Sequence, residues 1–298
     1  MADDRHHEFA ARLASICAVP VTPMDAHREI DLASTRRLAE HVAGSRAGTI
    51  TVGGSVAEFL ALTARERLDV LAATVDAVAG RTPVLASVGG DLGSARQEAR
   101  AAGAAGAAAV MVHQPLNPFR SPAGWVIYHA ELAAAIAPLP VVLYLRDPAI
   151  EPAHLAELSA RSPNLVGVKY ALPDGLAAFT AAVGERVVWL CGLAERATPD
   201  AWAAGATGFT SGLVTVDDAA PAALLDALRA GDAAGVQAAW AAASPFEELR
   251  ARRGGAASVG VVKTALVQRG VIADATVRPP LTPLDADEVA LVQALATS

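Results

Sequence analysis

Lysine is almost missing from this chain of 298 residues: 22 of its 24 basic residues are arginine, and only Lys169 and Lys263 are lysine. Aromatic residues make up 4% of the chain, whereas alanine alone accounts for 71 residues. A net charge of −7 leaves no basic excess of the kind that nucleic-acid-binding proteins carry. Since 53% of the residues are hydrophobic and only 18% charged, we expect a folded chain with a large core rather than a disordered one.

Cysteines and long apolar runs are also scarce. Cys17 and Cys191 lie too far apart to suggest a disulfide framework or a paired zinc-binding motif. No run of about 18 apolar residues is free of glycine, proline or charge, so no transmembrane helix is predicted. Residues 1–8 are too polar and acidic for a signal or transit peptide. We therefore expect a cytoplasmic protein that binds no membrane, no nucleic acid and no metal.

The fold prediction comes from short apolar runs that alternate with stretches of helical periodicity. Because the runs are almost continuously apolar, they are typical of parallel strands buried on both faces. They cover residues 16–20, 49–52, 83–88, 107–112, 140–144, 165–169, 187–191 and 207–211. Helical patterns cover residues 31–45, 63–79, 92–102, 122–137 and 152–161, with a capping-box pattern at Thr63 and Glu66. Eight such alternations predict a (β/α)8 TIM barrel, with an open doubly wound sheet as the alternative.

The residues after the last predicted strand show helical patterns only. We predict that residues 1–230 form the barrel and that residues 231–298 form a C-terminal helical extension packed on it, with Gly254-Gly255 as a hinge. The cluster of Arg250, Arg252 and Arg253 in this extension is interpreted as a solvated helix end.

Polar residues at strand ends are the candidates for chemistry, because the loops that follow the strands form the functional face of such a barrel. Lys169 ends an apolar run, and its amine can form an imine with a carbonyl compound, which an arginine cannot. Tyr144 ends the preceding run, where its phenol could move protons beside Lys169. The structural alternative is a lysine whose charge reaches solvent and a tyrosine that lies at the barrel mouth.

Gly53-Gly54-Ser55 follows the second predicted strand. Backbone amides and a hydroxyl at this position can hold a carboxylate, although the glycines are also compatible with a simple turn. His113 and Ser211 end two further strands. We interpret His113 as a hydrogen-bonded rim residue, with a substrate contact as the alternative, and Ser211 as a substrate contact.

Several motifs resemble the dihydrodipicolinate synthase/N-acetylneuraminate lyase family. Gly54-Ser-Val-Ala-Glu58 resembles its loop after the second strand, Leu143-Tyr144 the end of its fifth strand, and Asn164-Leu-Val-Gly-Val-Lys169 the segment that carries its Schiff-base lysine. Further landmarks match at residues 20–24, 191–192, 262–266 and 277–283, so the resemblance covers essentially the whole chain. It implies a lyase that needs no metal or organic cofactor, with Lys169 as the imine lysine and Tyr144 and Ser55 as its catalytic partners.

Other positions depart from the family pattern. The second threonine of the family's loop is Val56, its second tyrosine is replaced within Pro115-Leu-Asn117-Pro, and an arginine five residues after Tyr144 is Ala149. The last two changes count against dihydrodipicolinate synthase activity, which remains an alternative. A ligand-binding barrel without turnover is a second alternative, because fold does not fix function.

Tyr144-Leu-Arg146-Asp147 resembles the 5-dehydro-4-deoxyglucarate dehydratase branch of the family. This resemblance suggests that Arg146 holds the distal carboxylate of a sugar diacid by two parallel hydrogen bonds, unless it forms an ion pair with Asp147 or Glu195 at the rim.

The expected reaction is aldol cleavage or dehydration of a 2-oxo acid, most simply a keto-deoxy sugar acid. The residues predicted to bind this substrate are Gly54, Val56, Asn117, Arg146 and Ser211. Glu58 is interpreted as holding its loop by hydrogen bonds, whereas Lys263 receives no role. The family resemblance also implies a homo-oligomer, either a tetramer or a dimer.

Overall fold

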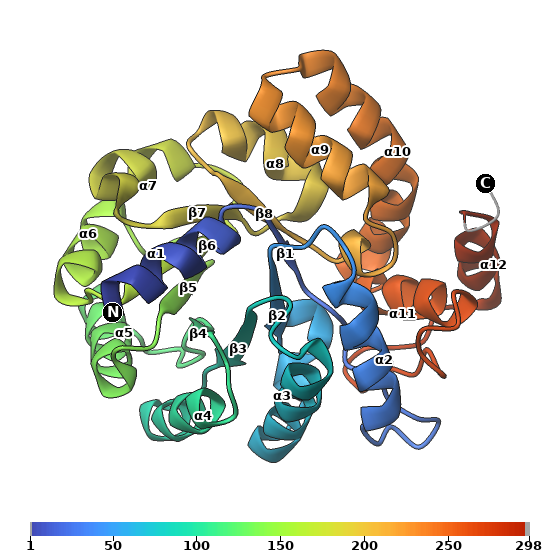
Figure 1. Cartoon of the computed structure of the whole chain (residues 1–298), viewed down its shortest axis with the longest axis horizontal. Coiled ribbons are helices and arrows are strands. Elements are labelled where there is room, and N and C mark those ends of the chain that lie inside the picture. The colour runs from blue at the N-terminus through green and yellow to red at the C-terminus, as the bar shows by residue number, and fades with distance from the viewer. Residues whose placement is uncertain (1, 296–298) are drawn as a thin grey trace.

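The computed structural model of the protein describes residues 2–295 and closes the sheet into a parallel barrel, as Figure 1 shows. Each strand pairs with its neighbours in the chain, and the last pairs with the first. This confirms the (β/α)8 barrel and excludes the open sheet. The strands are β1 (Ile16–Ala18), β2 (Thr49–Val52), β3 (Val84–Val88), β4 (Ala109–Val112), β5 (Val141–Leu145), β6 (Leu165–Tyr170), β7 (Val188–Cys191) and β8 (Gly208–Ser211).

All the predicted apolar runs contain a strand, with bounds that agree to within two residues. The agreement follows from burial: nearly every strand residue is buried, on the side facing the barrel interior as well as on the side facing the helices. The predicted ranges 1–230 and 231–298 begin and end at Met1 and Ser298, which lie outside the described residues.

The barrel helices surround the strands (Figure 1). Those predicted from periodicity are α2 (Leu32–Ala43), α3 (Ala64–Val78), α4 (Leu92–Ala104), α5 (Pro122–Ile136) and α6 (Pro152–Arg161). The predicted capping box forms at the start of α3, where the Thr63 hydroxyl and the Glu66 carboxylate each accept the other's backbone N–H. No ranges are predicted for α1 (Ala2–Leu13), α7 (Leu176–Val183) and α8 (Ala194–Ala203). The almost uniformly apolar α7 and the internal Pro199 of α8 obscure the helical signal.

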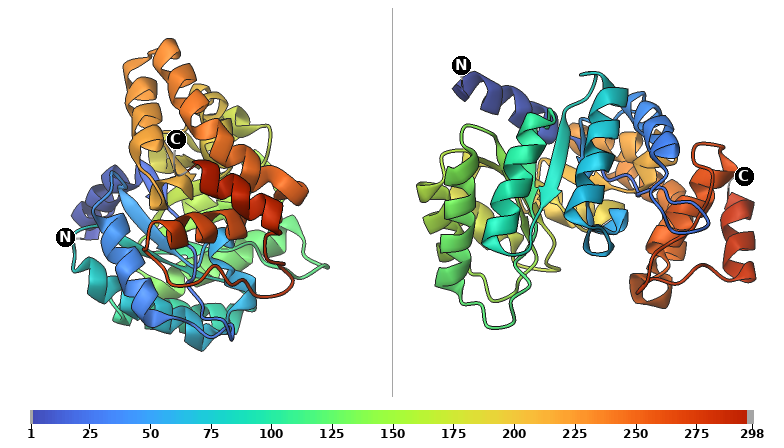
Figure 2. Two further views of the ribbon diagram at one scale, coloured as in Figure 1. Left: turned by 90° about the vertical axis from the view of Figure 1, so that its right-hand side faces the viewer. Right: turned by 90° about the horizontal axis from the view of Figure 1, so that it is seen from below.

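Helix α1 closes the end of the barrel where the strands begin. Phe9 and Leu13 are buried in one apolar cluster with barrel residues such as Leu85 and Met111. Gly167 on β6 makes room for this helix, since a Cβ there would lie 2.5 Å from Leu13 Cδ2. In the right-hand view of Figure 2, α1 lies on the opposite side of the molecule from the C-terminal helices. A candidate active site is therefore expected at the opposite end of the barrel, where the strands end.

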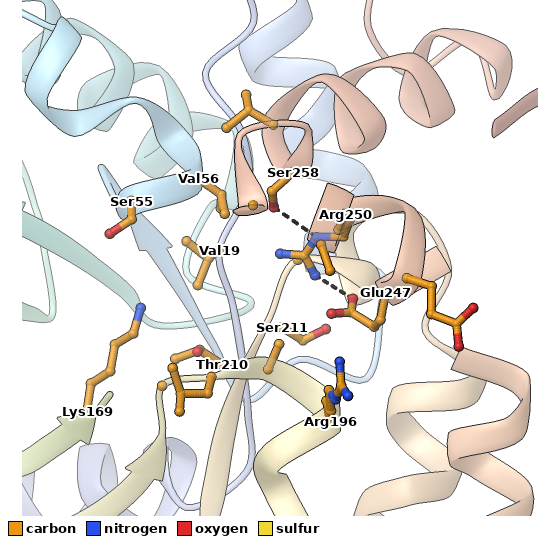
Figure 3. A pocket seen from close by; sticks show the side chains of 18 of the residues that line it. Val19, Ser55, Val56, Lys169, Arg196, Thr210, Ser211, Glu247, Arg250 and Ser258 are labelled. Atoms are coloured by element: carbon orange, nitrogen blue, oxygen red, sulfur yellow. Dashed lines mark hydrogen bonds and ion pairs between the residues drawn. The ribbon is translucent and has the colours of Figure 1, made fainter. Parts of the chain in front are cut away.

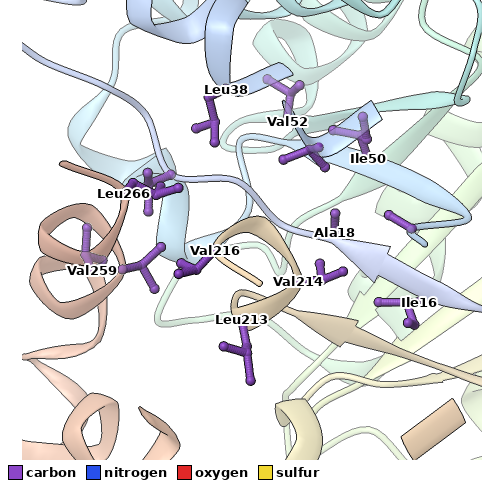
Figure 4. Close-up of a cluster of buried hydrophobic side chains, with 14 of the residues drawn as sticks. Ile16, Ala18, Leu38, Ile50, Val52, Leu213, Val214, Val216, Val259 and Leu266 are labelled. Atoms are coloured by element: carbon purple, nitrogen blue, oxygen red, sulfur yellow. The ribbon is translucent and has the colours of Figure 1, made fainter. Parts of the chain in front are cut away.

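The last barrel helix, α9 (Ala219–Ala230), is followed by α10 (Ala233–Ala251), α11 (Ser258–Gln268) and α12 (Ala286–Leu295). Side chains of the extension and of the barrel share one core; in Figure 4, Val259 and Leu266 lie near Leu38 and Val216. Gly254 and Gly255 both have positive φ, and the turn between α10 and α11 requires this backbone conformation. In residues 2–295, no helix combines the length and the apolar character needed to cross a membrane.

A buried ion pair joins the extension to the loop after β2, which contains the 3-10 helices η1 (Ser55–Ala57) and η2 (Phe59–Ala61). Lys263 on α11 donates to Glu58 Oε1 and to the Thr276 carbonyl, each at 2.6 Å. The other carboxylate oxygen of Glu58 accepts the backbone N–H of Arg278 at 2.7 Å. Burial lowers the pKa of the Lys263 ammonium, and the facing Glu58 carboxylate opposes this shift only in part.

Removing Lys263 leaves the Glu58 carboxylate buried without its cation. We expect Lys263→Met to lower the free energy of unfolding by about 3–5 kcal/mol, and Lys263→Met/Glu58→Gln to recover part of that loss. Denaturant unfolding measures both. Arg269→Met is the control, because the side chains of the Arg269–Asp217 pair are 41% and 45% exposed and solvent screens their attraction, so its loss should cost less than about 1 kcal/mol. An equal decrease in the free energy of unfolding for Lys263→Met and Arg269→Met would contradict this prediction.

Candidate active site

Lys169 and Tyr144 lie side by side at the ends of neighbouring strands. They are register partners between β6 and β5, so their side chains point to the same face of the sheet. Lys169 Nζ is 4.3 Å from the centroid of the Tyr144 ring, and both residues are buried. The structure therefore brings together the amine and the phenol that the sequence placed at adjacent strand ends.

Both side chains line a cavity of about 630 Å3, here called the Lys169 cavity. Figure 3 shows Lys169 on one side of it and the Glu247–Arg250–Ser258 group on the other. Barrel residues that line it include Val19, Ser55, Val56, Tyr144, Lys169, Gly192, Thr210 and Ser211. Residues of the C-terminal extension that line it include Trp240, Glu247, Glu248, Arg250 and Ser258. The cavity thus lies between the barrel mouth and the extension.

The loop after β2 is held against the cavity by close packing. Gly54 has no space for a side chain, since a Cβ there would lie 2.2 Å from Val19 Cγ1. Gly53 has a φ of 80°, and its carbonyl accepts a 3.0 Å hydrogen bond from His113 Nε2. His113 also stacks on Phe59, and burial lowers its pKa to about 3. His113 is therefore a neutral rim residue that supports the loop, as predicted.

Ser55 connects this loop to Tyr144. The Ser55 hydroxyl lies 3.3 Å from the Tyr144 hydroxyl, within hydrogen-bonding distance. Burial by itself raises the pKa of the Tyr144 phenol, but the charge of Lys169, the bond with Ser55 and the nearby Arg146 outweigh it. The net shift is downward, so the phenol is disposed to give up its proton. The predicted set of Lys169, Tyr144 and Ser55 thus forms one contiguous group.

The neighbouring strand ends make room for the lysine. A Cβ on Gly192, directly after β7, would lie 3.0 Å from Lys169 Cγ and 2.8 Å from the Tyr170 carbonyl oxygen. A side chain at residue 192 would therefore collide with the backbone and crowd the lysine stem. Thr210 on β8 also lines the cavity, and its hydroxyl donates to the Cys191 carbonyl at 3.3 Å. From the sequence, Gly192 was identified only as part of a motif that resembles the family, and Thr210 was not predicted to lie at the site.

Ser211 lines the cavity, but its hydroxyl is already engaged. It donates to Glu195 Oε1 and accepts the backbone N–H of Val214 at 2.9 Å. Glu195 is 1% exposed, and its second oxygen has no hydrogen-bond partner among the described residues. Burial, reinforced by the negative charge of Glu247 and opposed by Arg250, raises the pKa of Glu195 to about 7. The carboxyl is thus a buried titrating group directly behind the cavity wall.

Arg146 and Asn117, which were predicted to bind substrate, do not line the Lys169 cavity. Arg146 is exposed and lines a second cavity of about 600 Å3, with its guanidinium carbon 5.8 Å from the centroid of the Tyr144 ring. Of the two ion-pair partners considered for it, Asp147 instead pairs with Arg120, and Glu195 is buried beside Ser211. Asn117 lines neither cavity, and its side chain accepts the backbone N–H of Phe119 within a turn. Neither residue therefore lines the Lys169 cavity, whereas Val56 lines it and Gly54 lies beside it in the same loop.

The interpretation of the Arg250 cluster as a solvated helix end is wrong for Arg250 itself. This residue is only 8% exposed and faces the Lys169 cavity. Phe246, Leu249 and Arg250 are all buried on α10, at a spacing of three and four residues that marks the inner face of a helix. That spacing was the signal that could have placed Arg250 inside.

No group of three or more His, Cys, Asp or Glu residues in the described part of the chain is arranged to hold a metal ion. The side chains at the strand ends offer an amine, a phenol, hydroxyls and guanidiniums. Such a set can bind an anionic carbonyl compound, form an imine with it and transfer protons.

Comparisons with known proteins agree with this geometry. A model of the dihydrodipicolinate synthetase family matches residues 12–298. A probable 5-dehydro-4-deoxyglucarate dehydratase of Rhizobium rhizogenes is 32% identical over 292 residues, covering 96% of this chain and 95% of that protein. A 4-hydroxy-tetrahydrodipicolinate synthase of Mycolicibacterium paratuberculosis is 32% identical over 270 residues, covering 88% and 87%. The crystal structure of dihydrodipicolinate synthase from Oceanobacillus iheyensis superposes with a TM-score of 0.91 at 32% identity and covers 98% of each chain.

The raised pKa of Glu195 predicts a pH-dependent stability. A carboxyl whose pKa is higher in the folded than in the unfolded chain favours folding at low pH, and this contribution is lost as the pH rises through about 7. A glutamine does not titrate and can still accept the bond from Ser211. We therefore expect Glu195→Gln to gain free energy of unfolding relative to the wild type between pH 5 and pH 8, by on the order of 3 kcal/mol.

Denaturant unfolding at several pH values within that range measures this difference. Glu248→Gln, a matched change at an exposed position of the same helix as Glu247, controls for the substitution itself. A difference between Glu195→Gln and the wild type that stays constant with pH would contradict the prediction.

Proposed function

Since the chain belongs to the dihydrodipicolinate synthetase family and is a lyase of its aldolase and dehydratase kind, we propose that Lys169 forms a Schiff base with a 2-oxo acid. The observation that carries the proposal is the buried Lys169 amine beside Tyr144, whose hydroxyl lies within hydrogen-bonding distance of Ser55. An amine, a proton carrier and an open cavity are the three requirements of imine chemistry.

The loop after β2 is the proposed binding site for the carboxylate next to the reacting carbonyl. The backbone N–H groups of Ser55 and Val56 have no acceptor within residues 2–295, and the Ser55 side chain adds a hydroxyl. Close packing against Val19 and His113 keeps these donors in place. Donors fixed before the substrate arrives lose little entropy on binding and can stabilise charge that develops during the reaction.

The proposed reaction begins when Lys169 Nζ attacks the 2-oxo carbon. Tyr144 protonates the carbonyl oxygen, and loss of water from the carbinolamine gives an iminium ion. The iminium then accepts electrons: removal of a proton from C3 gives an enamine, which can expel a hydroxide from C4. Alternatively, cleavage of the C3–C4 bond releases an aldehyde. Hydrolysis of the remaining imine returns the free lysine.

A keto-deoxy sugar acid is the proposed substrate, with dehydration or retro-aldol cleavage as the reaction. The relative from Rhizobium rhizogenes is named as a dehydratase of such a compound. Polar groups on the cavity wall opposite Lys169, among them Glu247 and Arg250, suit a hydroxylated chain that extends away from the imine.

Synthase activity is the second candidate, because the relative from Mycolicibacterium paratuberculosis is named as a 4-hydroxy-tetrahydrodipicolinate synthase. Asn117 and Ala149 count against it, since neither supplies the phenol or the guanidinium that the synthase pattern has at these positions. An assay that combines pyruvate with aspartate semialdehyde distinguishes this activity from the lyase. A barrel that binds ligand without turnover would show neither activity, whether or not Lys169 is modified in the experiment below.

The proposed enzyme acts in the cytoplasm, where the free thiols of Cys17 and Cys191 suit a reducing compartment. It is further proposed to be a homo-oligomer, a tetramer or a dimer. Three exposed apolar side chains support an interface beside the second cavity: Leu60, Leu116 and Phe119, which are 73%, 63% and 94% exposed. Large apolar side chains this exposed are typical of a surface that a second chain covers.

Pyruvate with borohydride tests the Schiff base directly. Hydride addition to the iminium carbon leaves a stable secondary amine, which peptide mass spectrometry assigns to a residue. We expect the adduct on Lys169 and none on Lys263, whose ammonium is held by Glu58. Lys169→Arg, which keeps the charge, should abolish both the adduct and the lyase activity. The proposal is wrong if neither pyruvate nor any keto-deoxy acid modifies Lys169.

The oligomer is tested by light scattering after gel filtration. We expect a mass two or four times the 30.3 kDa of the chain, and a smaller species for Phe119→Asp, because a carboxylate in an apolar interface is costly. A wild-type mass equal to one chain would refute the oligomer, and an unchanged Phe119→Asp mass would refute this surface.

A further inference from the structure

The wall of the Lys169 cavity opposite the lysine carries a buried cation, Arg250. It comes from the end of α10 in the C-terminal extension, whereas Lys169 comes from β6 of the barrel. Figure 3 shows the two side chains facing the same space from opposite sides. A molecule attached to Lys169 would therefore extend towards this arginine.

Two of the three nitrogens of Arg250 are committed to protein partners. Nε donates to the Ser258 hydroxyl at 3.1 Å, and Nη1 donates to Glu247 Oε1. These bonds fix the orientation of the guanidinium, and 92% of the residue's surface is covered, since only 8% is exposed. The group is thus a rigid, oriented donor rather than a mobile surface charge.

The third nitrogen, Nη2, has no hydrogen-bond partner among residues 2–295. It lies on the Gly212 side of the guanidinium, where a Cβ on that glycine would come within 3.0 Å of it. Gly212 also lines the cavity, and Figure 3 shows one guanidinium nitrogen of Arg250 directed into the cavity, away from Glu247 and Ser258. Nη2 is not one of the fully buried unpaired atoms of the described residues, so its N–H pair is accessible from the cavity. An acceptor from a ligand would complete it.

A carboxylate is the acceptor that this position fits best. Guanidinium nitrogens only donate, and their bonds to carboxylates are about twice as strong as those to neutral acceptors. A second guanidinium, that of the exposed Arg196, lines the same cavity and has no ion-pair partner in the described part of the chain. Of the acidic groups nearby, Glu247 is already paired with Arg250, the raised pKa of Glu195 makes it partly neutral at pH 7, and Glu248 is exposed to solvent.

Arg146, the residue that the sequence suggested for this role, does not share the cavity. It lines the second cavity, over the Tyr144 ring, and is exposed. Within the Lys169 cavity, Arg250 is the buried guanidinium with a free donor.

We propose that Arg250 binds the carboxylate at the far end of a 2-oxo diacid whose 2-oxo carbon is bound to Lys169, and that it thereby makes the enzyme prefer diacids to monoacids. The proposal rests on the proposed function, because it takes Lys169 as the site of imine formation. It makes Arg250 a specificity-determining residue that belongs to the extension and not to the barrel.

A matched pair of probes isolates the far carboxylate. 2-Oxoadipate and 2-oxohexanoate both have six carbons and a 2-oxo acid end, and they differ only in whether the other end is a carboxylate or a methyl group. Borohydride trapping on Lys169, measured against probe concentration, gives half-trapping concentrations for both. We expect the wild type to trap 2-oxoadipate at a concentration about tenfold or more below that for 2-oxohexanoate.

Arg250→Met should abolish this preference by raising the half-trapping concentration of 2-oxoadipate alone. Trapping of 2-oxohexanoate and pyruvate should continue unchanged. Arg252→Met, the same change at an exposed arginine two residues along the chain, should keep the preference. Arg146→Ala should keep it as well. Because Arg250→Met leaves Glu247 unpaired, Glu247→Gln/Arg250→Met provides a second variant without that charge, and thermal unfolding shows which variants fold.

Two results in the wild type and in Arg146→Ala would overturn the inference: no preference for 2-oxoadipate in the wild type, or a preference that is lost in Arg146→Ala. Two results in the Arg250 variants would also overturn it: a preference that survives in both variants, or trapping of 2-oxoadipate and 2-oxohexanoate that is weakened equally in variants that fold. The last of these assigns Arg250 a structural role. If neither pyruvate nor any keto-deoxy acid modifies Lys169, the proposed function itself is wrong, so the two failures are distinguishable.

Discussion

The buried pair between Glu58 and Lys263 is the interaction on which the geometry of the site depends. It joins residues 205 positions apart, one in the loop after β2 and the other in the C-terminal extension. Both carboxylate oxygens of Glu58 are used, one by Lys263 and the other by the backbone of Arg278. Since a buried charge without its partner costs several kcal/mol, the loop and the extension can separate only at a high free energy. The Lys169 cavity lies between these two segments and is therefore fixed by the same pair.

The pair also explains why residue 263 is a lysine in a chain whose basic residues are almost all arginine. Lys263 is fully buried, and its ammonium donates to a carboxylate and a carbonyl within a small volume. A guanidinium is larger and planar, and its five donors would need partners that this space does not supply. Lys169 is the other lysine, and its strand-end position beside Tyr144 suits an amine that reacts with a carbonyl. Both lysines thus occupy buried positions where an arginine could not replace them.

The sequence predicted the barrel, its strands and the contact between Lys169 and Tyr144, because these follow from local patterns. Apolar runs mark buried strands, and register between neighbouring strands follows from their order around the barrel. It did not predict the burial of Arg250 or the partner of Lys263, because both depend on how the extension packs on the barrel. Arg146 illustrates the same limit: its motif placed it correctly after β5, but its guanidinium lines the second cavity beside the Tyr144 ring and not the Lys169 cavity.

The two sides of the Lys169 cavity therefore differ in how well they tolerate substitutions. Lys169, Tyr144 and Ser55 are held by strand register and by a loop with no spare volume around Gly54, so substitutions there disturb the barrel itself. The opposite wall consists mostly of side chains on α10, on the turn that follows it and at the start of α11, and α10 contacts the barrel through apolar packing. The turn after α10 is a connecting segment, and such segments tolerate changes more readily than the elements that they join. In the proposed enzyme the barrel accordingly supplies the groups for the chemistry, and the extension supplies those that can select the substrate.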